Sequence, residues 1–377
     1  MKAASTDKKH SHESPSAKVQ ILWLSDVHLG FKQFGLSKRE QDFQDAHQNV
    51  IALGLKRKVN CFLDSGDILN SNRPSPATMN YLRGINVQLE AAEVPYYLVA
   101  GNHDITQEDG VHWIDVIGGN SAKHGGIKLL DQKIVEVSGV KLYGIGHMSK
   151  EEFLALDVPK VDIISIHAPV MEFIGFTSSN MLSLDELPLD KAQFIALGDI
   201  HINDLRKYKG IPVGYTGSTS LNSFSESESK YVRIIIFEDG KWINSESVEI
   251  VGPTIRTTLK IKVEDGIQLE KWLGEIVVAY ADVPKKPLIY VSYPSTLDAM
   301  AKCRALLDPN KWILRFKPYS AQATKDPKRK ETQSLTPMQF MQQVMRPPAD
   351  IAGVVVDLLN PTASASEILD AFVETSI

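Results

Sequence analysis

Five short apolar runs in this chain each end on side chains that bind metal ions or transfer protons. In chain order these endings are Asp26-Val27-His28, Gly66-Asp67, Gly101-Asn102-His103-Asp104, His167 and Gly198-Asp199-Ile200-His201. Each run has the length of a buried strand, and groups that follow parallel strands collect at one rim of a sheet. The pattern therefore predicts a sheet whose rim gathers residues that lie far apart in the sequence.

Strand-like and helix-like segments alternate from Val19 to about Val251. Apolar runs predict strands at 20–24, 61–63, 96–100, 140–145, 163–166 and 194–197. Apolar spacing predicts a helix from about Lys38, and Ser75-Pro76 supplies the N-cap and first-turn proline of a second helix. We expect residues 19–251 to form an α/β domain.

The pattern changes after Val251. Residues 252–320 alternate as β-α-β-α-β, which predicts a small second α/β domain. A polar stretch at 321–334 contains the basic run 325–330, interpreted first as a solvated linker and second as a phosphate-contacting segment. The spacing of apolar residues in 335–377 predicts two amphipathic helices, which could dock on their own domain or on a partner. Residues 1–18 are polar and predict a disordered arm.

Composition limits the compartment and the partners. Cys61 and Cys303 lie in apolar runs, which predicts buried reduced thiols in a reducing compartment. No apolar stretch reaches the ~18 residues of a membrane span, so we expect a cytoplasmic protein without membrane contact, in the host cytoplasm if it is phage-encoded. The net charge of −5 gives no support for nucleic-acid binding at the level of the whole chain, so any basic groove must be local.

Each motif alone is weak, because Asp-x-His occurs by chance and Gly-Asp often forms a turn. Together the five motifs predict a dimetal phosphoesterase. Hydrolysis of a phosphodiester needs a nucleophile at neutral pH and neutralisation of charge on the phosphoryl oxygens, and two divalent cations ~3.5–4 Å apart supply both. The mixture of imidazole, carboxylate and carboxamide suits manganese, iron or zinc better than calcium. Asp67 is the candidate bridging ligand.

The order and spacing of the motifs resemble the calcineurin-like metallophosphoesterase superfamily. Within it they resemble the SbcD-type nuclease subunits of double-strand-break repair complexes, including the phage recombination endonuclease subunit that pairs with an ABC ATPase. The narrower resemblance rests on Gly66–Ser75, which leads into a Pro-Ser helix start, and on Tyr215–Thr219 followed by Phe224 and Glu226. It implies a β-sandwich flanked by helices, a small α/β capping domain and C-terminal helices.

The resemblance also implies two ligand sets. Asp26, His28, Asp67 and His201 would hold one metal ion, and Asp67, Asn102, His167 and Asp199 would hold the other. His103 would be catalytic, facing the scissile phosphate to protonate the leaving oxygen or stabilise the transition state, and Asp104 would orient its ring.

Asp199 departs from the family pattern, which has Gly-His-x-His where this chain has Gly198-Asp199-Ile200-His201. The extra carboxylate adds negative charge and would shift metal preference. Asp199 as a ligand, as a residue that supports a ligand, and as the mark of a weakened second metal site all remain open.

The leading functional hypothesis is a manganese-dependent DNA exonuclease and endonuclease subunit of an SbcCD-like complex. The resemblance implies its substrates, double-stranded ends and single strands, as well as an SbcC-like ABC ATPase bound through the C-terminal helices and a homodimer. Magnesium, iron and zinc are the alternative metals. The alternative functions are a small-molecule phosphodiesterase or phosphatase, and a catalytically weak structural subunit whose only support is Asp199. A His103→Ala variant separates the structural-subunit hypothesis from the other two.

Overall fold

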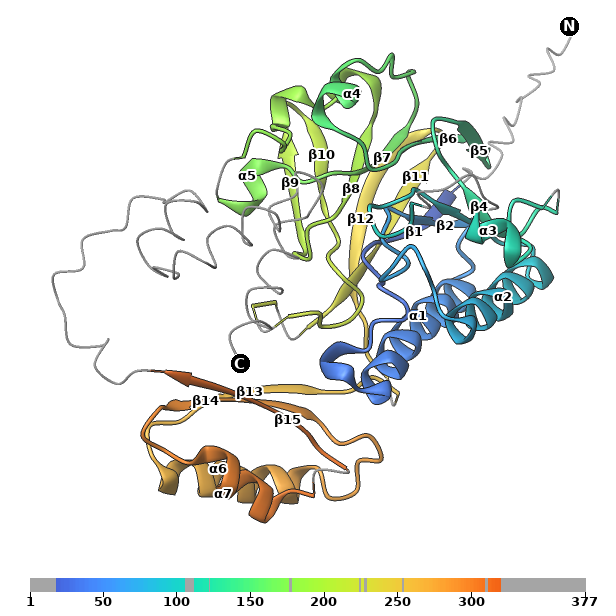
Figure 1. Ribbon diagram of the computed structural model, residues 1–377. Coiled ribbons are helices and arrows are strands. Elements are labelled where there is room, and N and C mark those ends of the chain that lie inside the picture. Colours follow the sequence, from blue (N-terminus) through green and yellow to red (C-terminus); the bar gives the residue numbers. More distant parts are fainter. Residues whose placement is uncertain are drawn as a thin grey trace, which may run out of the picture. The chain divides into compact units, whose positions relative to one another are not determined.

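The structure is a computed structural model that describes residues 18–105, 112–121, 123–175, 178–223, 225–226, 229–252, 254–308 and 311–319 (Figure 1). The chain divides into two units, residues 1–321 and 322–377, and only the first contains described residues. The predicted arm up to residue 17, all of the predicted linker and the predicted tail helices thus lie outside the described residues. Lys18, which the sequence placed in the arm, begins the first strand.

Two six-stranded sheets form the body of residues 19–251. The first has the order β12-β11-β1-β2-β3-β4 and the second β5-β6-β7-β8-β10-β9. The first sheet contains β1 (Lys18–Leu24), β2 (Cys61–Asp64), β3 (Pro95–Leu98), β4 (Gly126–Leu129), β11 (Tyr231–Glu238) and β12 (Lys241–Glu249). The second contains β5 (Ile134–Val137), β6 (Val140–Ile145), β7 (Ile163–His167), β8 (Phe194–Gly198), β9 (Asp204–Tyr208) and β10 (Ile211–Tyr215).

The apolar run of β1 shows why the two sheets stack. Side chains alternate along a strand, so Ile21 and Trp23 join the core between the sheets while Leu22 and Leu24 join the core under the helices. The Trp23 ring meets Phe194 of the second sheet edge to face at 5.6 Å. A strand buried on both faces needs an unbroken apolar sequence, which is the pattern that predicted β1.

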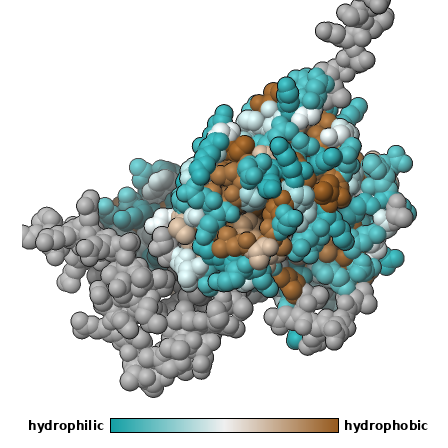
Figure 2. Space-filling model, turned by 90° about the horizontal axis from the view of Figure 1, so that it is seen from above, coloured by the Kyte–Doolittle hydropathy of each residue, from teal (hydrophilic) through white to brown (hydrophobic). Residues whose placement is uncertain are grey.

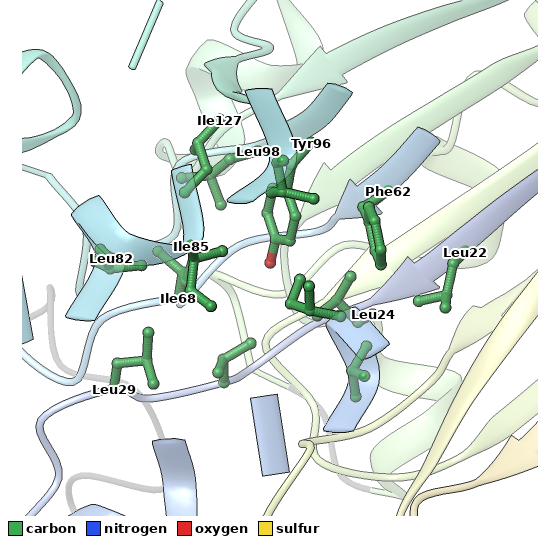
Figure 3. Packing of buried hydrophobic residues seen from close by; sticks show 14 of the residues in the cluster. Leu22, Leu24, Leu29, Phe62, Ile68, Leu82, Ile85, Tyr96, Leu98 and Ile127 are labelled. Atoms are coloured by element: carbon green, nitrogen blue, oxygen red, sulfur yellow. The ribbon is translucent and has the colours of Figure 1, made fainter. Parts of the chain in front are cut away.

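Helices cover the outer face of the first sheet. Figure 1 shows α1 and α2 running along β1 to β3, and Figure 3 shows Leu82 and Ile85 of α2 packed toward the β3 residue Leu98. The Ser75 hydroxyl caps α2 by accepting the Thr78 N–H at 3.2 Å, which confirms the N-cap expected from Ser75-Pro76. The helices are α1 (Ser37–Arg57), α2 (Pro76–Ala91), α3 (Trp113–Val116), α4 (Lys150–Leu154) and α5 (Met171–Ile174), with 3₁₀ turns η1 (Gln33–Gly35), η2 (Leu184–Glu186) and η3 (Leu189–Lys191).

A second fold follows the sandwich. It consists of β13 (Thr258–Lys262), α6 (Gly266–Ala279), β14 (Leu288–Pro294), α7 (Ala299–Leu306) and β15 (Ile313–Tyr319). Its three strands are parallel, and α6 and α7 share a core with them. This element order is the one expected for the capping domain. Cys303 lies in this core and Cys61 between the two large sheets, both as buried free thiols, as the sequence predicted.

Apolar runs did not predict six strands of the sandwich, β4, β5 and β9 to β12. Several of these strands carry exposed polar residues, as in the edge strand β12, and so lack the continuous apolar signature. Figure 2 shows hydrophobic residues scattered among hydrophilic ones over one face of the molecule, the usual composition of a protein surface. Among the described helices, none combines the length and apolarity of a bilayer span.

Candidate metal centre

The predicted site residues lie just beyond, or at, the carboxyl ends of parallel strands. Asp26 and His28 follow β1, Asp67 follows β2, Asn102 and His103 follow β3, His167 ends β7, and Asp199 and His201 follow β8. Both sheets contribute, so the site lies where the two rims meet. Asp26, His28, Asp67 and Asp199 have positive φ angles of 53°, 50°, 58° and 99°. Such backbone conformations cost of order 1–3 kcal/mol each and cluster at functional sites.

Two glycines of the motifs are required by close packing. A Cβ on Gly66 would lie 2.3 Å from His167 Nδ1, and a Cβ on Gly101 would lie 2.0 Å from Asp67 Oδ1. Any larger residue would displace these side chains. The glycines of Gly-Asp and Gly-Asn-His thus let backbone approach the site closely.

One group of side chains gathers around His201. Its Nε2 lies 3.1 Å from His28 Nε2 and 3.8 Å from Asp26 Oδ1. Ligand atoms of these three residues all lie within 4.8 Å of one another. Asp26 is fully buried, and within the described chain its Oδ2 has no hydrogen-bond partner.

A second group gathers around His167 Nε2. This atom lies 3.2 Å from Asn102 Oδ1, 3.6 Å from Asp67 Oδ1 and 3.8 Å from Asp199 Oδ1. Asp67 also groups with His28 and His103 within 4.8 Å, so its carboxylate lies between the two groups. The structure thus brings together all seven residues predicted as ligands; their roles as ligands stay predictions.

The site concentrates buried negative charge. Burial raises the pKa of Asp26, Asp67 and Asp199. Repulsion from Asp104, Asp26 and Asp199 raises the pKa of Asp67 further, and repulsion from Asp26 raises that of Asp199. Buried carboxylates are tolerated when they are paired or coordinate metal ions. The unpartnered Asp26 Oδ2 and the mixed nitrogen and oxygen donors therefore fit divalent transition-metal ions.

Hydrogen bonds orient three imidazoles with Nε2 toward the site. His167 Nδ1 donates to the Ser65 carbonyl at 2.7 Å, His103 Nδ1 to the Asn70 carbonyl at 2.8 Å, and His201 Nδ1 to Glu226 Oε1 at 2.8 Å. Such partners fix the tautomer and leave the Nε2 lone pair available for a ligand. Burial lowers the pKa of His167 to about 4, which keeps this ring neutral and able to bind metal at neutral pH.

Asp104 has a different role from the one expected. Its buried carboxylate accepts the backbone N–H groups of Asp67, Leu69 and Gly101 at 2.8 to 2.9 Å. The His103 ring is oriented instead by the Asn70 carbonyl. Asp104 therefore positions the Asp67 and Gly101 backbone, because a single carboxylate there joins the loops after β2 and β3.

Glu226 and Lys230 are site residues for which the sequence pattern gave no role. Glu226 accepts from His201, and Lys230 donates to its other oxygen and to Ser218 Oγ. Burial alone would raise the pKa of Glu226, but the charges of His201 and Lys230 outweigh it and lower that pKa to about 2. The sequence analysis singled out Glu226 only as part of the family resemblance, because a single glutamate in a Ser-rich segment does not by itself indicate a metal site.

His47 lies away from the metal centre. It is buried between Tyr81 and Tyr96, with Nδ1 3.0 Å from the Tyr81 hydroxyl. These contacts give His47 a structural role on the buried face of α1.

Comparison with known proteins agrees with this geometry. Residues 19–203 match the calcineurin-like phosphoesterase family. The fold and the family match together identify residues 19–203 as a calcineurin-like phosphoesterase domain.

More particularly, the chain resembles archaeal proteins named DNA double-strand break repair protein Mre11. It is 28% identical to that of Methanosarcina acetivorans over 63% of this chain and 39% of the relative, and 27% identical to that of Haloferax volcanii over 58% and 49%. For Methanocaldococcus jannaschii the identity is 24% over 72% and 76%. The chain thus spans less than half the length of the first two relatives.

Proposed function

We propose that this chain is the nuclease subunit of a DNA end-processing complex and hydrolyses phosphodiester bonds with two divalent metal ions, manganese first among them. The observation that carries the proposal is the convergence of His167, Asn102, Asp67 and Asp199 beside the His28, His201 and Asp26 group. The similarity to Mre11 proteins supports DNA as the substrate.

Two bound cations would supply charge neutralisation for a phosphodiester and a nucleophile at neutral pH. The protein itself would supply the side chains that bind these cations and would hold them in position. His28 and His201 offer Nε2 atoms, Asp67 offers its two oxygens to the two groups, and Asp199 takes the position of an imidazole in the family pattern. Asp104 and Glu226 hold these ligands in place through backbone and ring contacts.

We infer that His103 is the group that transfers a proton. Its side chain is 18% exposed, so substrate can reach it, and its Nε2 lies 3.9 Å from Asp67 Oδ2. The Asn70 carbonyl holds the opposite ring nitrogen, which directs Nε2 toward the centre. A protonated His103 would donate to the leaving oxygen or stabilise the charge that develops on the phosphate.

Assembly is the second part of the proposal. We infer an SbcC-like ABC ATPase partner bound through residues 335–377 and a homodimer, both by resemblance to the SbcD-type subunits. Deleting residues 336–377 would abolish association with the ATPase and spare manganese-dependent cleavage of a small diester. Retained association would contradict this assignment.

The decisive experiment compares manganese-dependent cleavage of end-labelled linear DNA with cleavage of an aryl phosphodiester, with metal content measured in parallel. His103→Ala would lower DNA cleavage by about 10²- to 10⁴-fold, whereas the matched control His124→Ala would leave it unchanged. Cleavage of the small diester alone would indicate a small-molecule phosphodiesterase. A protein without activity that binds one metal ion or none would indicate a structural subunit.

A further inference from the structure

The segment after β10 reaches from the metal centre to the capping domain. We call residues 216–230 the Glu226 loop; the structure describes 216–223, 225–226 and 229–230 of it. One part of this loop holds a predicted metal ligand, and another part is buried against strands of the capping domain. No other contact described above joins these two regions so directly.

The metal end of the loop is a buried ion pair. Glu226 holds His201 Nδ1 at 2.8 Å with one oxygen, and its other oxygen accepts from Lys230, from Ser218 Oγ at 3.1 Å and from the Asn222 N–H at 3.1 Å. The Glu226 and Lys230 side chains are 8% and 9% exposed. Such a fully bonded carboxylate has little freedom, so the position of the loop sets the orientation of the His201 ring.

The cap end of the loop is a buried leucine. Leu221 is 4% exposed and packs with Leu288 and Tyr290 of β14 and Ile313 of β15. Leu36, just before α1, packs against the same cluster. In addition, Lys260 of β13 donates to the Glu226 backbone carbonyl. A shift of the capping sheet therefore moves the loop through its apolar anchor and through this hydrogen bond.

A buried charge cluster holds the capping domain and the loop to the same helix. Asp42 of α1 accepts from Arg39 at 2.5 Å and from Arg256 at 2.6 Å, and it forms an ion pair with Lys285 at 2.6 Å. Arg39 in turn donates to the Leu221 carbonyl at 2.9 Å. Arg39 and Asp42 are each 2% exposed, so loss of one partner would leave a buried charge uncompensated.

We propose that the Glu226 loop couples the capping domain to the metal centre, with Glu226 as a positioning residue for His201. Displacement of the capping domain would change metal affinity on the His201 side, and by linkage metal binding would favour one position of the capping domain. This inference rests on the proposed function only for the metal centre itself; it makes no use of DNA as the substrate.

The test is a double-mutant cycle on Mn²⁺ affinity, measured by calorimetry on the full chain. Glu226→Ala would weaken the affected Mn²⁺ site by about tenfold or more, and Glu226→Gln by less, because its amide oxygen still accepts from His201. Leu221→Ala would weaken the same site by about threefold. In the Glu226→Ala background Leu221→Ala would not change the Mn²⁺ affinity further, because the contact between the loop and His201 is already lost. Equal effects of Leu221→Ala in both backgrounds would overturn the proposal.

A pair of surface variants on one strand tests the coupling without disturbing a core. Lys260→Met removes the contact with the loop, whereas Lys262→Met on the same strand removes a lysine that lies over the Tyr319 ring. We expect weaker Mn²⁺ binding for Lys260→Met and wild-type binding for Lys262→Met. Equal Mn²⁺ affinity in the two variants would contradict the coupling.

The readout separates this inference from the proposed function. A wild-type protein that binds two Mn²⁺ ions but cleaves no DNA would refute the nuclease proposal and leave the coupling to be decided by the cycle. A wild-type protein that binds no Mn²⁺ would refute both.

Discussion

The Nε2 atoms of His28 and His201 face each other 3.1 Å apart, although one residue follows β1 of the first sheet and the other follows β8 of the second. Glu226 accepts from the opposite nitrogen of the His201 ring, which directs Nε2 of that ring toward His28. Burial lowers the pKa of His28 well below its usual value, which keeps that ring neutral. The proposed cation between the two rings would take both nitrogens as ligands.

Metal binding should raise thermal stability. Mn²⁺ at about 100 times its dissociation constant adds about 2.7 kcal/mol to the free energy of unfolding, or roughly 3 to 4 °C in Tm for a chain of this length. Asp67→Asn should lose most of this increase, because Asp67 lies between both groups of ligands. The exposed Asp190→Asn serves as the control and should retain it. Calorimetric melts with Mn²⁺ and with a chelator check the prediction; an equal increase for Asp67→Asn would count against the shared ligand.

Asp199 should set the metal preference. Asp199→His restores the imidazole of the family pattern, and because imidazole suits Zn²⁺ better than a carboxylate does, the affinity for Zn²⁺ relative to Mn²⁺ should rise about tenfold. Asp239→His is a matched control, since Asp239 also has a positive φ but lies in an exposed turn. Competition titrations measure the ratio. An unchanged ratio for Asp199→His would mean that Asp199 is not a ligand.

Asp104 should be important for stability through the backbone. Asp104→Asn replaces one of the two carboxylate oxygens with an N–H₂ group, which cannot accept. Either the Leu69 N–H, bonded to Oδ1, or the Asp67 and Gly101 N–H groups, bonded to Oδ2, then lose their acceptor. We expect a loss of about 1–3 kcal/mol in the free energy of unfolding for each N–H left unpaired. Denaturant unfolding of the metal-free protein measures it, beside the exposed Asp115→Asn. A loss no larger than that of Asp115→Asn would refute this role.

His47 should make stability depend on pH. Burial lowers its pKa from 6.5 to about 3. Below pH 6.5 the unfolded chain therefore takes up a proton that the folded chain does not, so stability is full above pH 6.5 and falls toward pH 3, by about 1.4 kcal/mol per unit. Metal-free His47→Gln should lose less stability between pH 6.5 and 4 than wild type, and His124→Gln should match wild type. Parallel pH curves for wild type and His47→Gln would contradict the assignment.

Much of the site could be predicted from the sequence because its signals are local. A strand buried on both faces requires a continuous apolar run, and each predicted ligand lies at, or within a few residues of, the end of such a run. The glycines before Asp67 and Asn102 belong to the same local pattern, because the backbone there must approach neighbouring groups closely. Hence the ligand order, the α/β class and the capping domain's element order were all accessible from the chain.

Other features were decided only by tertiary structure. Asp104 accepts backbone N–H groups from two loops, and Glu226 meets His201, because the packing of two sheets brings these segments together. The burial that lowers the pKa of His167 to about 4, and the contact of Leu221 with β14 and β15, arise in the same way. Strand propensity and the chemical type of each predicted ligand are properties of short segments, so they can be predicted from the sequence. Distances, hydrogen-bond partners and desolvation depend on which segments become neighbours, and the packing of the whole chain determines that.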